Sequence, residues 1–135
     1  MHVGHFDGAS QSSLCGVGMM LLVDDTHCFQ MWMACGSGTT TKVDLLALWG
    51  LLYFAHKLCF LSLQVFGHSG VIIDRASNKC TIQDAVLDHW CSRIICFISD
   101  FSIISSSHIF RHFNQVAHKL LEKAISCEVG TLYFK

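Results

Sequence analysis

The chain contains no proline, and only 14% of its 135 residues are charged. Without proline or a low-complexity tract there is no linker at which to divide it. We therefore expect one domain over residues 1–135, with its core at about 5–125 and an unassigned tail at 126–135. The lysines and arginines are few and scattered, and the formal net charge is −1. Charge therefore neither indicates nor excludes a nucleic-acid partner, which a basic stripe would indicate.

Long uninterrupted apolar runs are also absent. The longest apolar segment, residues 43–66, is divided by His56 and Lys57 into pieces shorter than the roughly 20 residues that a membrane span needs. The N-terminal sequence MHVGHFDGAS lacks the basic start and the apolar run of a secretory signal. We expect a soluble monomer that is intracellular, cytoplasmic or nuclear rather than secreted, with no membrane and no defined protein partner.

No two of the eight cysteines have the C-x-x-C spacing of a zinc knuckle. Most of them lie inside apolar runs, where a free thiol behaves as a small hydrophobic side chain. Disulfides and zinc ligation are the alternatives, but the spacing favours reduced, structural cysteines. The set comprises Cys15, Cys28, Cys35, Cys59, Cys80, Cys91, Cys96 and Cys127.

Apolar periodicity predicts strands first, then a helix, then an alternation of the two. Three short apolar runs separated by Ser, Gly and Asp clusters are typical of an antiparallel meander. From Thr40 the apolar residues cover nearly the whole circumference of a helix, which predicts that this helix is buried. The expected strands are 5–9, 16–23, 29–35, 61–67 and 103–110, and the later expected helices are 70–77, 82–101 and 114–125. The order is β-β-β-α-β-α-α-β-α.

Two of the later helices have a predicted apolar stripe that faces the core. The members are Val86, Trp90, Ile94 and Phe97 in the first, and Val116, Ala117, Leu120, Leu121 and Ala124 in the second. Asn114 is the expected N-cap of the last helix, because its side chain can accept a bond from a free amide of the first turn.

Five short motifs follow one another at characteristic intervals. They are FDGAS (6–10), CGVG (15–18), TTTKVDLLAL (39–48), VFGHS (65–69) and HIFRHFNQVAHKL (108–120). None is specific alone, but together with the order of elements they resemble ribonuclease H, specifically the plant retroelement-type (reverse-transcriptase-like) domain. The resemblance covers about residues 5–125.

The resemblance implies an α/β fold with a mixed five-stranded sheet and helices on both faces. It also implies four carboxylates that hold two Mg²⁺ (or Mn²⁺) ions, which cleave the RNA strand of an RNA/DNA hybrid. The four family positions hold Asp7, Asp44, His68 and His118 in this chain. Asp7 is unchanged, Asp44 is one methylene shorter than the usual glutamate, and the other two are histidines. The metal ligands that remain are Asp7 and Asp44.

Further roles follow from the same resemblance. His108 matches a family histidine that assists catalysis or product release. Thr40 and Thr41 stand where the family usually has asparagines that contact both strands of the hybrid. Ser10 and Asn114 also fit positions that contact the nucleic acid.

Charge counting argues against a stable pair of Mg²⁺ ions at these positions. Two divalent ions about 4 Å apart repel by roughly 4 kcal/mol in bulk water and by about four times that at an effective dielectric near 20. Four carboxylates offset the four positive charges, whereas two aspartates supply two negative charges and neutral imidazoles supply none.

Simpler interpretations of the same residues stay open. An Asp-Gly pair such as Asp7 and Gly8 is typical of a turn, and Asp44 near a helix start fits the helix macrodipole. His68 and His118 could be polar residues at a vacated site. With the two aspartates they could also form a mixed nitrogen and oxygen site for Zn²⁺ or Mn²⁺.

Two classes of function remain. The first is a ribonuclease H-type domain whose hydrolytic activity is lost or strongly impaired. The second is a non-catalytic nucleic-acid-binding or scaffold module that keeps the fold. The segment SNKCTIQ, residues 77–83, leaves no room for the basic helix with which some family members hold substrate. Binding of an RNA/DNA hybrid should therefore be weak and sensitive to salt.

Overall fold

The computed structural model describes residues 2–11, 14–24, 26–36, 40–67, 85–109, 114–125, 127 and 132–134. Their strands are β1 (His2–Gln11), β2 (Leu14–Leu22), β3 (Cys28–Gly36), β4 (Ser62–Gly67), β5 (Ile103–His108) and β6 (Leu132–Phe134). The helices are α1 (Thr40–Lys57), α3 (Ala85–Ser99) and α4 (Gln115–Ile125). The predicted order is confirmed for the elements within these residues, and the helix expected at 70–77 lies outside them.

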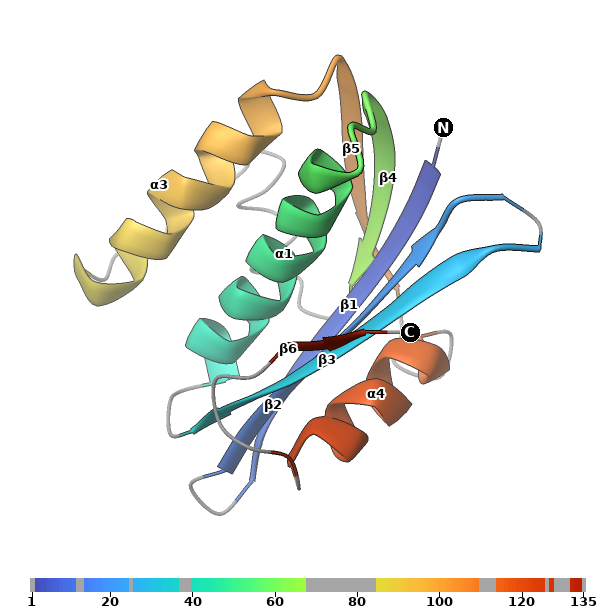
Figure 1. The fold of residues 1–135 in the computed structure, drawn as a ribbon. Coiled ribbons are helices and arrows are strands. Elements are labelled where there is room, and N and C mark those ends of the chain that lie inside the picture. Colours follow the sequence, from blue (N-terminus) through green and yellow to red (C-terminus); the bar gives the residue numbers. More distant parts are fainter. Residues whose placement is uncertain are drawn as a thin grey trace.

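Within the described residues the sheet is mixed and has six strands in the order β5-β4-β1-β2-β3-β6. Strands β1, β2 and β3 form an antiparallel meander, while β4 runs parallel to β1 and β5 runs parallel to β4. Helices α1 and α3 cover one face and α4 covers the other (Figure 1). The expected arrangement of a mixed sheet with helices on both faces is therefore confirmed.

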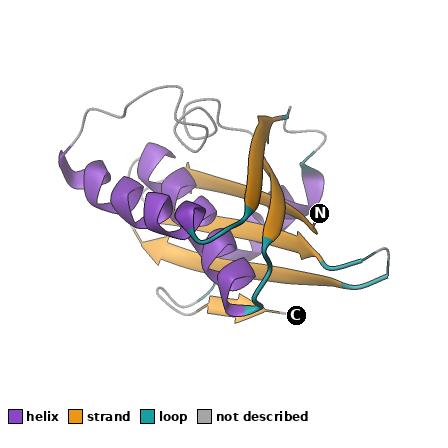
Figure 2. Ribbon diagram, turned by 90° about the horizontal axis from the view of Figure 1, so that it is seen from above, coloured by secondary structure: helices purple, strands orange, loops and turns teal. Residues whose placement is uncertain are grey.

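The sixth strand was not predicted. It comes from the tail that the sequence left unassigned, and it pairs antiparallel with β3, with Trp32 opposite Tyr133. Figure 2 shows this short strand beside the C-terminus at the edge of the sheet. It extends the predicted five-stranded sheet because β3 would otherwise present unpaired amide and carbonyl groups along that edge.

Helix α1 is buried, as predicted from its apolar circumference. Its buried residues include Leu45, Leu48, Leu51 and Leu52, and they pack between the sheet and α3. None of the helices in the described ranges is long and apolar enough to cross a membrane.

The predicted stripe of α4 is right except at its first member. Ala117, Leu120, Leu121 and Ala124 are buried, whereas Val116 is 38% exposed. Residues 117, 120, 121 and 124 are centred on one side of the helix, and that side faces the sheet. Val116 lies on the flank of the same side and is therefore partly open to solvent.

No disulfide joins the seven cysteines that the structure describes. Burial raises the pKa of the Cys35 thiol to about 11, and neighbouring Cys15 adds to this shift. Cys35 is therefore a neutral thiol near pH 7, as a structural cysteine should be. Cys80 lies outside the described residues.

Helix α4 approaches β2 closely at two glycines. A Cβ built at Gly18 would lie 2.2 Å from Ala117 O and 2.6 Å from Leu121 N, and one at Gly16 would lie 2.8 Å from Leu121 O. These neighbours are backbone atoms of a packed helix, so they cannot rotate away as a flexible side chain can.

We therefore expect Gly18→Ala to lower the free energy of unfolding by about 3 kcal/mol, because α4 must move off the sheet. Gly50→Ala is the matched control, since its Cβ would meet the flexible end of Met19, 2.6 Å from Sδ. There the gain in helix propensity offsets the crowding, so the change should stay within about 1 kcal/mol. Urea unfolding followed by circular dichroism measures both variants. Equal destabilisation by the two substitutions would contradict this account of the α4 contact.

Candidate active site

Asp7 lies in β1 opposite Gly18 of β2, beneath α4. Residues alternate between the two faces of a strand. Gly4 and Gly8 touch α1, so Asp7 points to the α4 face. Its side chain is only 2% exposed, and its Oδ1 accepts a bond of 2.9 Å from the Gly8 amide. Asp7 is therefore an ordered, buried carboxylate within a strand, and its interpretation as a simple turn residue is wrong.

His118 contacts Asp7 directly. Its Nδ1 lies 3.2 Å from Asp7 Oδ2, and its Nε2 lies 3.0 Å from Glu122 Oε1, one turn further along α4. A carboxylate can only accept, and a neutral imidazole has a single N–H, so the neutral ring satisfies one of these contacts at a time. His118 thus lies between two carboxylates.

Asn114 attaches the start of α4 to β1. Its side chain is buried, and its Nδ2 donates a bond of 2.8 Å to Phe6 O, the carbonyl that precedes Asp7. His5 Nδ1 donates to Asn114 Oδ1 over 3.0 Å, and the His5 ring stacks on Phe66 of β4. Burial lowers the pKa of His5, which favours the neutral ring that this arrangement uses.

The predicted N-cap is confirmed in position, although its side chain has another role. Asn114 O accepts a bond of 3.1 Å from the His118 amide, which begins the helix. The Asn114 side chain binds β1 rather than the free amides of the first turn. Both polar atoms of the Asn114 side chain, Oδ1 and Nδ2, therefore bond to β1, one turn before His118.

Asp44 lies near the start of α1 and is 7% exposed. The residue before it, Val43, packs on the residue after Asp7: a Cβ at Gly8 would lie 2.8 Å from Val43 Cγ1. Helix α1 begins at Thr40, so Asp44 is its fifth residue and lies beyond the first turn. The macrodipole effect fades within that turn, so it does not account for a buried carboxylate here.

The other predicted site residues are placed only in part. Strand β4 ends at Gly67, beside Phe6 of β1, and His68 lies outside the described residues. His108 is the exposed last residue of β5 and pairs with Gly67. Thr40 and Thr41 are the first two residues of α1, and Ser10 lies near the end of β1. The structure does not describe the side chains of these three residues. Within the described ranges, no group of three His, Cys, Asp or Glu side chains has an arrangement that could hold a metal ion.

Comparison with known proteins places this arrangement in a family. A family model described as reverse transcriptase-like matches residues 5–124. The chain belongs to the reverse transcriptase-like family. No curated protein sequence matches this reverse transcriptase-like chain at a significant level.

Solved ribonuclease H structures share the fold of this reverse transcriptase-like domain. RNase H1 from the halophilic archaeon Halobacterium salinarum has a TM-score of 0.84 at 23% identity, covering 91% of this chain and 96% of that protein. The N-terminal RNase H domain of a Mycobacterium tuberculosis protein, solved as a fusion with maltose-binding protein, has a TM-score of 0.86 at 21% identity and covers 92% of each chain. LC11-RNase H1, solved in complex with an RNA/DNA hybrid, has a TM-score of 0.82 at 19% identity, covering 93% and 96%. The fold of ribonuclease H is therefore established.

Two residues of the site were missed from the sequence. Glu122 follows His118 by four positions on a helix, and that spacing is a recognisable signal of a side-chain contact. His5 carried no such signal, because it meets Asn114 across 109 positions of sequence.

Asn114→Ala should lower the free energy of unfolding by about 3 kcal/mol, because it leaves Phe6 O and the His5 ring without their buried partners. Gln115→Ala, at the exposed neighbouring position, should change it by less than about 0.5 kcal/mol. Thermal and urea unfolding of the two variants test the difference. A similar small effect at both positions would show that Asn114 does not hold α4 on β1.

Proposed function

We propose that this chain is a ribonuclease H-type domain, plant retroelement-like in its motifs, whose hydrolysis of RNA in RNA/DNA hybrids is lost or strongly impaired. The observation that carries the proposal is the 3.2 Å contact between His118 Nδ1 and Asp7 Oδ2. In the family that this chain resembles, both positions supply carboxylates. Here a carboxylate and an imidazole bind each other instead.

The donor set does not fit a pair of Mg²⁺ ions. Mg²⁺ is a hard cation that demands oxygen ligands in near-octahedral geometry. Of the Asp7 oxygens, Oδ1 accepts from the Gly8 amide and Oδ2 faces the His118 ring. A metal ion bound to Asp7 would have to displace the His118 ring from Oδ2. Of the four family positions, only Asp44 would supply a second carboxylate.

A mixed Zn²⁺ or Mn²⁺ site has less support. The two nitrogens of His118 face different carboxylates, Asp7 through Nδ1 and Glu122 through Nε2. Asp7, His118 and Glu122 therefore do not converge on one point in this arrangement, and His68, the other histidine of the mixed site, lies outside the described residues. The neutral His118 ring donates to one of these carboxylates at a time.

The second candidate is a nucleic-acid-binding or scaffold module without catalysis. LC11-RNase H1, whose fold is similar, was solved with an RNA/DNA hybrid, which favours retained affinity for such a duplex. The formal net charge of −1 gives little general attraction to phosphates, so binding should be weak and should fall steeply with salt. Retardation of a labelled hybrid at low salt, without cleavage, would favour this module.

Restoration of the carboxylates should restore cleavage. The triple variant His68→Asp, His118→Asp and Asp44→Glu should cleave the RNA strand of a labelled hybrid in Mg²⁺ or Mn²⁺, whereas the parent should stay near background. Each single His→Asp variant should also stay silent, because residues that act as one unit are strongly non-additive. The control adds Asp7→Asn to the triple variant, which should abolish the regained activity.

Two results would count against the proposal. Robust Mg²⁺-dependent cleavage by the parent would show that the histidines are compatible with catalysis. A folded triple variant that binds the hybrid and leaves it intact would show that the lost carboxylates are not the cause of inactivity. Circular dichroism melting of every variant separates these results from misfolding.

A further inference from the structure

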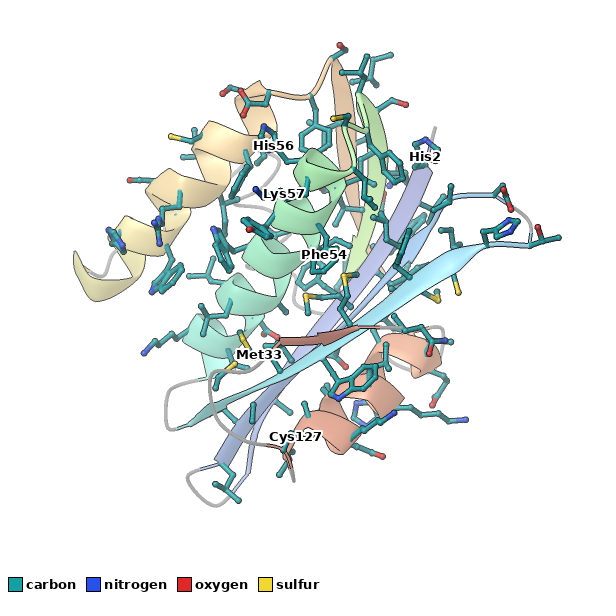
Figure 3. The ribbon with its side chains drawn as sticks, viewed as in Figure 1. His2, Met33, Phe54, His56, Lys57 and Cys127 are labelled. Carbon is teal, nitrogen blue, oxygen red and sulfur yellow. The ribbon has the colours of Figure 1, made fainter. Side chains whose placement is uncertain are left out.

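A surface pocket of about 350 Å³ lies between α1 and α3, on the face of the sheet opposite to Asp7 and α4. Figure 3 labels His56 and Lys57 near the C-terminal end of α1, next to α3. The volume of the pocket falls in the range of small-molecule sites. The pocket is lined by Trp49, Tyr53, Arg93, Cys96, Phe97 and Asp100.

Three half-buried aromatic rings form the walls. Trp49 and Tyr53 stack with their centroids 5.4 Å apart, and Phe97 meets Tyr53 edge-on at 6.2 Å and 83°. Trp49 and Phe97 pack partly against the core, and all three rings also border the pocket. Flat aromatic faces beside a pocket suit a planar ligand that stacks.

Charged groups lie around these rings. Arg93 Cζ lies 5.6 Å from the Trp90 ring centroid, and Lys57 Nζ lies 5.6 Å from that of Tyr53. Asp100 Oδ2 lies 3.2 Å from His56 Nε2, and the Asp100 side chain is more than half exposed. Arg93 lies on α3 and Asp100 directly follows the last residue of that helix, Ser99; the helical rise from Arg93 to Ser99 is about 9 Å. The pocket therefore offers a cation and a carboxylate at separate points of an aromatic surface.

We propose that this pocket binds a nucleotide whose base carries an exocyclic amino group, as adenine does, either free or as an unpaired unit of a strand. The base stacks on Trp49 or Tyr53, whose rings lie within 29° of parallel, with Phe97 edge-on to Tyr53, since every base presents a π face to aromatic side chains. Its exocyclic amino group donates to Asp100, and the phosphate contacts Arg93. The pocket lies on another face than the Asp7 site, so the inference does not rest on the proposed function.

Isothermal titration calorimetry at low salt tests the proposal with three probes: adenosine monophosphate, a short oligoadenylate and ribose 5-phosphate. Saturable binding of the monophosphate would identify a free nucleotide as sufficient, and binding of the oligoadenylate alone would assign the site to a strand. Ribose 5-phosphate has no base and should bind at least about tenfold more weakly. Failure of both adenine probes, or equal affinity for ribose 5-phosphate, would overturn the proposal.

Two variants assign binding to this pocket. Cys96→Phe fills it from an exposed position on α3 and should abolish binding, whereas Cys28→Phe, at an exposed cysteine of β3, should leave binding unchanged. Arg93→Gln should weaken nucleotide binding about tenfold through loss of the charged contact. Circular dichroism melting shows whether each variant is folded. Parental affinity in folded Cys96→Phe or in Arg93→Gln would overturn the assignment.

Discussion

The site depends on the close approach of α4 to β2 at Gly18. Gly18 lies opposite Asp7, and a Cβ at this glycine would come within 2.2 Å of Ala117 O. The absence of a side chain lets the helix backbone lie on the strand, and His118, the residue after Ala117, then reaches Asp7. Asn114 fixes the helix one turn earlier through its bond to Phe6 O. The contact between Asp7 and His118 is therefore a consequence of helix packing as well as of the histidine itself.

This packing gives the proposed loss of activity a physical meaning. Clustered carboxylates repel one another when no metal is bound, and that repulsion raises their affinity for cations. Where an imidazole replaces one of the carboxylates, the repulsion is smaller, because a neutral ring carries no negative charge and can donate to the carboxylate beside it. On this proposal, histidine in place of a carboxylate at position 118 leaves a site with less negative charge to attract metal ions, in which Asp7 has a hydrogen-bond partner within the protein. The fold can remain stable without the chemistry, as is common when active-site strain is relieved.

Much of the fold could be predicted because it follows from the local spacing of apolar residues along the sequence. The meander and α1 follow from apolar patterns, and the strands differ from the prediction mainly at their ends. Strand β6 could not be predicted, because three residues carry little pattern and their pairing depends on the open edge of β3. The motifs predicted Asp7, Asp44 and His118, and the structure brings Asp7 and His118 into contact. Neither the bond between His5 and Asn114 nor the pocket between α1 and α3 has a local signal, because each depends on elements far apart in sequence.

The central claim is that Asp7 is satisfied by His118 and does not hold a pair of Mg²⁺ ions. The most direct test is the melting temperature of the parent chain in a chelator and in about 10 mM Mg²⁺, with Asp7→Asn as the control. A ligand present at ten times its dissociation constant stabilises by about 1.4 kcal/mol, which would raise the melting temperature by roughly 5 °C. The account predicts a change below about 1 °C in both proteins. A rise of several degrees in the parent that disappears in Asp7→Asn would show that Asp7 still binds the metal, and would contradict it.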